Sequence, residues 1–180
     1  MSPTPLVAEQ MSPTAGSGPE GSGVAHAQVG IVGNVAVDDY EQGVIRVHEQ
    51  IHEHRARHLA DHLHGLRMQS SPIALAHRAD PELAALVAAI AAGEEPVLDF
   101  VAPDGLHQQI WRVSDRAPVE AIRGALADVP LYLIDGHHRA AAAVHHRRQS
   151  TDPAADWMLS AIFGADELRN EAFHRVLHDI

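Results

Sequence analysis

Leu131-Tyr132-Leu133-Ile134-Asp135-Gly136-His137-His138-Arg139, followed by four alanines and Val144, is the stretch that decides the fold. Its apolar first half predicts a short buried strand, Asp135-Gly136 predicts a tight turn, and the alanine-rich remainder predicts a helix that reaches about Arg148. Alanine side chains are small, so such a helix can pack closely on its sheet. We therefore expect a strand–turn–helix unit at the centre of the fold.

The polar residues of this turn indicate a functional site. A strand-to-helix corner directs free backbone N–H groups and the positive end of the helix dipole at whatever lies above it, which favours anions. Arg139 adds a bidentate donor for phosphate or carboxylate, and His137 and His138 add imidazoles that can donate, accept or bind a metal near neutral pH. The alternative is a plain helix start with Asp135 near the N-cap and exposed histidines.

The composition excludes several classes of function. The 180 residues carry a net charge of −11 at pH 7, which argues against a general nucleic-acid binder because no basic surface is available for phosphates. All 13 cationic residues are arginine, so a mechanism that needs lysine is excluded. Cysteine is absent, which excludes disulfides, thiolate nucleophiles and cysteine zinc sites. With no apolar run near the roughly 20 residues of a membrane span and no signal pattern, we expect a cytoplasmic protein without a membrane partner.

The chain is expected to form a flexible leader, residues 1–23, and a single domain, residues 24–180. The expected elements of the domain are one or two strands in 24–37, a turn at 38–40, a helix at 51–67 with Leu59, Leu63 and Leu66 in the core, a buried strand at 71–76, a helix at 81–92, a hairpin of 97–101 and 108–113, a helix at 118–127, a loop at 150–156, a strand at 157–163 and a mixed or helical tail. This alternation predicts an α/β (α+β) fold.

A second motif suggests zinc chemistry. His48-Glu49-Gln50-Ile51-His52 matches H-E-x-x-H, in which two imidazoles one helical turn apart hold Zn²⁺ and the glutamate activates water. His58 stands where the extended motif has its third ligand, although Arg55 replaces the turn glycine. His54, His58 and His62 also form a stripe at helical spacing, which we interpret as a solvated helix face. A zinc hydrolase is therefore one alternative.

Three motifs follow one another in an order that resembles a known superfamily. His48-Glu49-Gln50, the apolar strand led by Pro72 and the Asp135–Arg139 turn resemble the free L-serine kinases of the ParB/sulfiredoxin-like superfamily. A widespread uncharacterised bacterial family related to these kinases is more similar still. The stretches that resemble its landmarks are Asp38-Asp39-Tyr40, residues 43–49, Ile110-Trp111-Arg112-Val113 and Phe173-His174-Arg175. The resemblance covers roughly residues 28–175 and implies a ParB/sulfiredoxin-like mixed sheet with flanking helices.

The resemblance also implies roles for individual residues. In the serine kinases the glutamate of H-E-Q acts as the base on the substrate hydroxyl, so this catalytic role falls to Glu49, with His138 as its catalytic neighbour. The other implied roles are nucleotide and phosphate binding by Gly136, His137, His138 and Arg139, metal binding by Asp135, and substrate contact by His48 and Arg55.

The function that this resemblance implies is a nucleotide-dependent kinase for free serine or a similar hydroxy amino acid, with Mg²⁺ and with ADP or ATP as phosphate donor. Phosphoryl transfer needs positioning, charge neutralisation and a carboxylate for the hydroxyl proton, none of which requires lysine. The alternatives are a non-catalytic nucleotide-binding regulatory module and the zinc hydrolase. Members of the related family usually continue for a second half, so we expect part of the substrate-binding wall to be missing or to come from another subunit, as in a homodimer.

Overall fold

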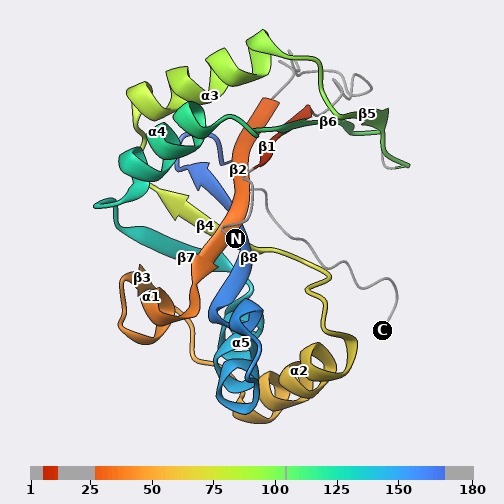
Figure 1. Cartoon of the computed structure of the whole chain (residues 1–180), viewed down its shortest axis with the longest axis vertical. Helices are drawn as coiled ribbons and strands as arrows, with labels where there is room; N and C mark the ends of the chain where they lie inside the picture. The colour runs from red at the N-terminus through yellow and green to blue at the C-terminus, as the bar shows by residue number, and fades with distance from the viewer. Residues whose placement is uncertain (1–5, 12–26, 104, 169–180) are drawn as a thin grey trace, which may run out of the picture.

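The computed structural model describes residues 6–11, 27–103 and 105–168. The strands are β1 (Leu6–Met11), β2 (Ala27–Ala36), β3 (Ile45–Arg46), β4 (Ile73–His77), β5 (Leu98–Val101), β6 (His107–Arg112), β7 (Leu131–Asp135) and β8 (Trp157–Gly164). The helices are α1 (Val37–Glu41), α2 (Glu53–Leu66), α3 (Pro81–Gly93), α4 (Arg116–Leu126), α5 (His137–Gln149) and the 3₁₀ helix η1 (Pro153–Asp156). The strands form one mixed sheet in the order β3-β7-β4-β8-β2-β1-β6-β5 (Figure 1). The predicted α+β fold with a mixed sheet and flanking helices is confirmed.

Helices pack on both faces of the sheet. Ile31 and Ile162 border cavities beneath both α3 and α4, so these two helices lie over the same face. Leu159 comes three residues before Ile162 and therefore points to the opposite face of β8. It borders a pocket together with Ala143 of α5 and Leu63 of α2. Figure 1 shows the α3–α4 pair and the α2–α5 pair at opposite ends of the molecule.

The centre of the core lies where β4, β7 and β8 meet α5. Leu75, Leu133 and Ala140 are fully buried there, and each of the two leucines contributes about 1.5–3 kcal/mol when buried. The prediction that all of β7 is buried is wrong, because Tyr132 is 51% exposed and Ile134 is 37% exposed. Successive side chains of a strand point to opposite faces, and only the face of β7 that carries Leu133 is covered.

The contact between α2 and α5 is built from small residues. Ala56 and Ala60, four residues apart on one face of α2, are the buried residues of that helix. The prediction that Leu59, Leu63 and Leu66 form its core face is wrong, since Leu66 is 51% exposed and the other two are only half-buried. Because α5 carries a run of four alanines, alanines on α2 let the two helices pack closely, which leucines at the contact would prevent.

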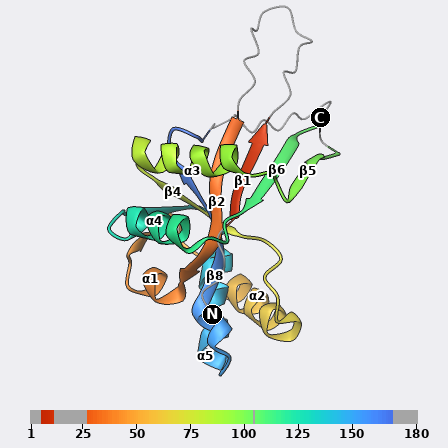
Figure 2. The same ribbon diagram turned by 45° about the horizontal axis from the view of Figure 1, so that its top comes forward.

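Four predictions about the ends, turns and loops need correction or lie outside the described residues. The expected flexible leader contains β1, which pairs antiparallel with both β2 and β6 (Figure 2). Its backbone is therefore ordered by two hydrogen-bonded ladders, and the rest of residues 1–23 lies outside the described residues. Residues 38–40, expected as a turn, belong to α1, and η1 lies within the expected loop 150–156. The predicted tail from residue 169 also lies outside the described residues.

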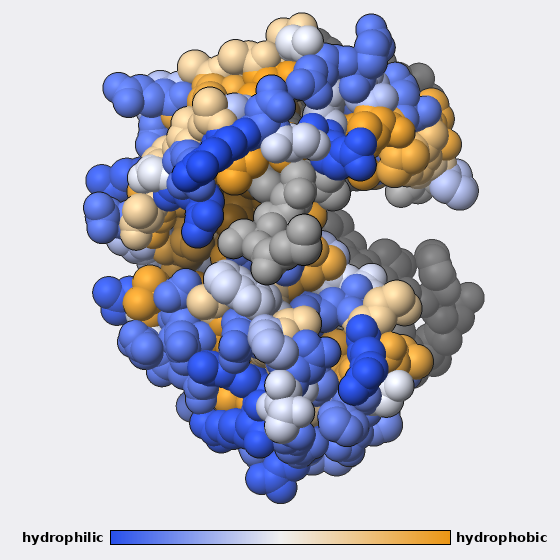
Figure 3. All heavy atoms as spheres, in the orientation of Figure 1, coloured by the Kyte–Doolittle hydropathy of each residue, from blue (hydrophilic) through white to orange (hydrophobic). Residues whose placement is uncertain are grey.

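The surface of the described part differs between the two ends of the molecule. Figure 3 shows a mostly hydrophilic surface over the α2–α5 end and apolar patches at the opposite end. The exposed large apolar side chains around the edge strand β5 are those of Val97, Leu98, Phe100 and Val101. Within the described residues, no helix combines the length and apolar character that a membrane crossing requires.

Arg147 near the end of α5 joins three segments. Its guanidinium donates to the Asp38 carboxylate of α1, lies 3.4 Å from a Glu41 oxygen, and donates to Asp156 of η1 over 2.8 Å. The hydrogen bond from Arg147 lowers the pKa of Asp38, which favours its ionised form. Arg148 contacts only Glu41 of this acidic group, at 2.7 Å. Arg147 is thus the residue that holds α1 and η1 against α5.

We expect Arg147→Met to lower the urea midpoint of unfolding more than Arg148→Met, since Arg147 has three carboxylate partners and Arg148 has one. Methionine keeps much of the aliphatic stem, so the comparison isolates the charged contacts. Equal midpoints for the two variants, measured by circular dichroism at neutral pH, would contradict this role of Arg147.

Candidate functional site

The candidate site is built on the corner between β7 and α5. β7 ends at Asp135, and α5 begins at His137 after Gly136, which has a left-handed φ of 94°. A Cβ atom at position 136 would lie 3.0 Å from Cγ2 of Ile73 and 3.1 Å from Nε of Arg139. The left-handed backbone therefore favours glycine, and any larger residue would also have to displace Ile73 and Arg139 slightly. The predicted strand–turn–helix unit is confirmed.

The pairing of three strands brings distant segments to this corner. β3 runs parallel to β7, with Ile45 opposite Leu131, so the carboxyl ends of both strands meet at one edge of the sheet. β4 runs antiparallel to β7 and therefore begins at the same edge. Residues 47–52, which follow β3, and Pro72, which precedes β4, consequently lie beside the corner.

Arg139 orients the carboxylate of Asp135. One guanidinium nitrogen of Arg139 donates to the Pro72 carbonyl and the other terminal nitrogen donates to Asp135. The Asp135 side chain is nevertheless 73% exposed, and that of Arg139 is 32% exposed. The corner thus presents a fixed, solvent-facing carboxylate, while the guanidinium keeps further N–H donors for a ligand.

Glu49 and His48 contact the first residue of α5. Oε2 of Glu49 lies 3.5 Å from Nδ1 of His137, and the ring of His48 meets that of His137 edge-on at 4.6 Å. The His137 side chain is only 3% exposed, whereas the Glu49 side chain is 61% exposed. Burial lowers the pKa of His137, with smaller opposing effects from Glu49 and Asp135. His137 is therefore neutral at physiological pH and faces an accessible carboxylate.

His138 holds the other end of the same loop. The backbone N–H of His52 donates to Nε2 of His138 over 3.1 Å, and the two rings stack at 5.7 Å with an angle of 18°. Nε2 of His138 is therefore engaged as an acceptor, and Nδ1 is the nitrogen left for another partner. The prediction of a catalytic His138 remains a prediction, restricted to Nδ1.

Sequence reasoning missed the remaining histidine contacts of α5. Nε2 of His145 lies 3.2 Å from Oε1 of Glu53, and His146 meets His64 edge-on at 5.7 Å. Every histidine of α5 thus contacts the segment 48–64. The only signal in the sequence was the spacing, because His137, His138 and His145 fall within about 100° around a helix of 3.6 residues per turn.

The structure brings most of the predicted site residues together. His48, Glu49, Asp135 and the Gly136–Arg139 segment lie at one edge of the sheet. The His137 side chain is buried, so a phosphate could contact this residue only through its backbone N–H, and that binding role stays a prediction. Arg55 is exposed in the first turn of α2, and the described residues offer its side chain no ion-pair partner. Its substrate contact stays a prediction.

The H-E-x-x-H segment does not have the geometry of a zinc-binding helix. α2 begins at Glu53, so His48 and His52 precede the helix instead of standing one turn apart on it. Among residues 6–11, 27–103 and 105–168, no group of three or more histidine, aspartate or glutamate side chains is placed to hold a metal ion. The histidine stripe His54, His58 and His62 is exposed, as predicted. The zinc-helix interpretation is therefore wrong.

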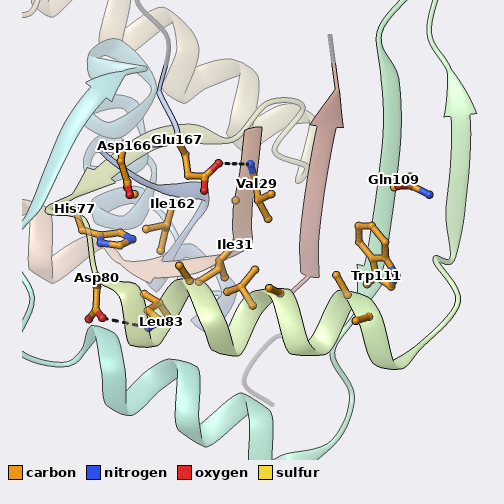
Figure 4. Close-up of a pocket in the computed structure, with 17 residues that line it drawn as sticks. Val29, Ile31, His77, Asp80, Leu83, Gln109, Trp111, Ile162, Asp166 and Glu167 are labelled. Carbon is orange, nitrogen blue, oxygen red and sulfur yellow. Dashed lines mark hydrogen bonds between the residues drawn. The ribbon is translucent and has the colours of Figure 1, made fainter. Parts of the chain in front are cut away.

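A separate cavity of about 590 Å³ lies beneath α3 (Figure 4). Apolar side chains such as Ile31 and Leu83 line it, and His77 and Asp80 stand at its polar end. Asp80 is the N-cap of α3, accepting from the backbone N–H of Glu82. No residue of the 47–52 loop or of the Asp135–Arg139 corner lines this cavity, so it is distinct from the candidate site.

We expect Gly136→Ala to lower the free energy of unfolding by about 1–2 kcal/mol, because alanine is strained in left-handed backbone, and to displace Arg139 as well. Gly65→Ala is the matched control, since nothing lies within 4 Å of a Cβ atom at position 65 and alanine favours a helix. Urea unfolding measures both variants. A Gly136→Ala protein as stable as Gly65→Ala would contradict the described corner.

We also expect acid to destabilise the protein through its α5 histidines. Burial lowers the pKa of both His137 and His146 from 6.5. Below about pH 6.5 the histidines of the unfolded chain bind protons that these folded imidazoles do not bind. The stability that the two neutral imidazoles contribute is therefore complete above that pH and is lost as the pH falls. Urea midpoints at about pH 7.5 and 5.5 should differ less in His146→Gln than in the wild type. His58→Gln, at an exposed position, should leave the difference unchanged.

Comparisons with known proteins give a family and no activity. A family model with the description Protein of unknown function (DUF1015) matches residues 19–180, which is most of the chain. No curated protein and no solved structure matches it.

Proposed function

This chain belongs to the DUF1015 family of proteins of unknown function, and within that family we propose that it is a nucleotide-dependent kinase for free serine or a similar hydroxy amino acid. The observation that carries the proposal is the approach of Glu49 to within 3.5 Å of His137. This contact brings the carboxylate of the His48-Glu49-Gln50 motif to the corner formed by Asp135–Arg139. The resemblance to the serine kinases of the ParB/sulfiredoxin-like superfamily supports the same activity.

Glu49 is the proposed general base. Its carboxylate is accessible, lies on a loop at the end of β3 and faces the corner where a phosphate donor would bind. A carboxylate in this position can accept the proton of a substrate hydroxyl as its oxygen attacks phosphorus. In that step the new oxygen–phosphorus bond forms, the bond from the terminal phosphorus to the nucleotide breaks, and the hydroxyl proton passes to Glu49.

The corner is the proposed binding site for the nucleotide phosphates. The first N–H groups of α5 have no partners within the helix and can donate to phosphate oxygens. Gly136 lets Arg139 keep its position at the corner, because a Cβ atom there would crowd the side chains of Ile73 and Arg139. Nδ1 of His138 and the remaining N–H groups of Arg139 can donate to the same oxygens. These donors replace the lysine that the chain lacks.

The residues of the corner fit a Mg²⁺ ion that is shared with the nucleotide. Mg²⁺ in such sites is held by one or two carboxylates together with substrate phosphates, and Asp135 presents one exposed carboxylate fixed by Arg139. Mg²⁺ would neutralise the charge of the phosphates. ADP or ATP would serve as the phosphate donor.

In this proposal, the hydroxy amino acid that accepts the phosphoryl group binds beside the 47–52 loop. His48 is exposed beside Glu49, and Arg55 is exposed one turn into α2. An imidazole and a guanidinium can bind the carboxylate of an amino acid. A second subunit of a homodimer could complete this side of the site. We place the reaction in the cytoplasm, with no nucleic acid or membrane as partner.

The test is incubation of the protein with Mg²⁺, ADP or ATP, and a panel of free hydroxy amino acids, followed by ³¹P NMR. Glu49→Gln should lower the turnover by about 10²–10⁴-fold, the usual contribution of a general base, while calorimetry shows nucleotide affinity unchanged. The wild-type protein should form an O-phospho amino acid with at least one acceptor.

Glu53→Gln is the matched control, because Glu53 contacts His145 and Arg57 and no residue of the corner. It should keep its turnover. Nucleotide binding without a phosphorylated product for any acceptor would overturn the kinase proposal and favour a regulatory nucleotide-binding module. Equal losses of turnover in Glu49→Gln and Glu53→Gln would show that Glu49 is not the general base.

A further inference from the structure

The loop that carries Glu49 is attached to α5 by two histidines. Residues 47–52 have no helix or strand of their own. Glu49 and His48 contact His137, and the backbone N–H of His52 donates to His138. The position of the Glu49 carboxylate therefore depends on these two neighbouring imidazoles.

The contact with His52 indicates which ring nitrogen of His138 carries the proton. A backbone N–H can only donate, so Nε2 of His138 must be unprotonated to accept it. With Nε2 as the acceptor, the ring proton is on Nδ1. A cationic His138 would lose this hydrogen bond.

The surroundings of His137 lead to the same tautomer. Its Nε2 atom is buried, and within the described residues it has no hydrogen-bond partner. A buried N–H without an acceptor is rarer in proteins than an unpaired acceptor, so Nε2 is the unprotonated nitrogen. Nδ1 then carries the proton, and an oxygen of Glu49 lies 3.5 Å from it. Such contacts are often long without substrate and shorten in the reactive complex.

We infer that His137 is a positioning residue, which holds Oε2 of Glu49 through its Nδ1–H and leaves Oε1 free to accept the proton of the substrate hydroxyl. This inference rests on the proposed kinase activity. It gives the His137 side chain a role in the reaction without contact to either substrate. His137 is 4% exposed, so it acts through Glu49 and not on the phosphate. His138 supports it by fixing the far end of the loop.

The kinetic test compares three variants. His137→Leu removes the donor, His137→Asn returns an amide N–H near the position of Nδ1, and His58→Leu makes the same substitution at an exposed histidine. We expect His137→Leu to lower kcat about a hundredfold, the effect of a misplaced catalytic group, with KM for both substrates within about threefold. His137→Asn should recover most of the loss, and His58→Leu should match the wild type.

Two further readouts separate positioning from a general loss of structure. The acid limb of the pH–rate profile should move to higher pH in His137→Leu, because an N–H donor stabilises an ionised carboxylate. In a Glu49→Gln background, His137→Leu should cause no further loss of kcat, because both changes affect one unit. Additive losses, an unmoved acid limb, or His137→Asn no better than His137→Leu would overturn the inference.

The tautomers of His137 and His138 can be tested without measuring kinase activity. In ¹⁵N NMR spectra of the wild-type protein at pH 7.5, the ring protons of His137 and His138 should both be on Nδ1. Spectra of His137→Asn and His138→Gln identify the signals of each residue. A proton on Nε2 of His137 would overturn the inference even if the kinase is active. If the wild type transfers no phosphoryl group, the proposed function fails, and the tautomers still decide whether His137 holds Glu49. The wild-type spectra also decide the matter if His137→Leu does not fold.

Discussion

The parallel pairing of β3 with β7 is the constraint on which the site depends. Only two residue pairs make this contact, Ile45 with Leu131 and Arg46 with Tyr132. They nevertheless align the carboxyl ends of two strands that are more than 80 residues apart in the sequence, so that the Glu49 loop leaves the sheet next to Gly136. In a mixed sheet, β4 then begins at the same edge, and the Pro72 carbonyl can accept from Arg139.

Helix α5 connects the stability of the fold with the site. Its alanines let α2 pack closely, and this proximity brings the four histidines of α5 within reach of residues 48–64. Arg147, near the other end of the helix, fixes α1 and η1. A helix held at both ends in this way gives its N-terminal residues a defined position. The polar links from α5 to the Glu49 loop are made by the imidazoles of His137 and His138.

Arg139 already has hydrogen-bond partners, so a site without lysine would need other groups to bind phosphate. The guanidinium already donates to Pro72 and to Asp135, so part of its hydrogen-bonding capacity serves to orient a carboxylate. In the proposed kinase, backbone N–H groups of α5 and Nδ1 of His138 would then carry more of the phosphate binding. A divalent cation on Asp135 would supply the positive charge that the residues of the corner do not.

The sequence by itself determined the local units: the strand–turn–helix corner, the hairpin of β5 and β6, and most helix positions, because residue periodicity, glycine and proline act over short distances. It also identified Glu49 and the Asp135–Arg139 segment as the residues of interest. Only the tertiary structure decided the partners of the histidines, the burial of His137 and the exposure of Leu66. These depend on which helix faces lie together, and the close approach of alanine surfaces leaves no clear mark in the apolar pattern of either helix. The pairing of β1 with β2 and β6 was likewise decided by contacts between distant parts of the chain.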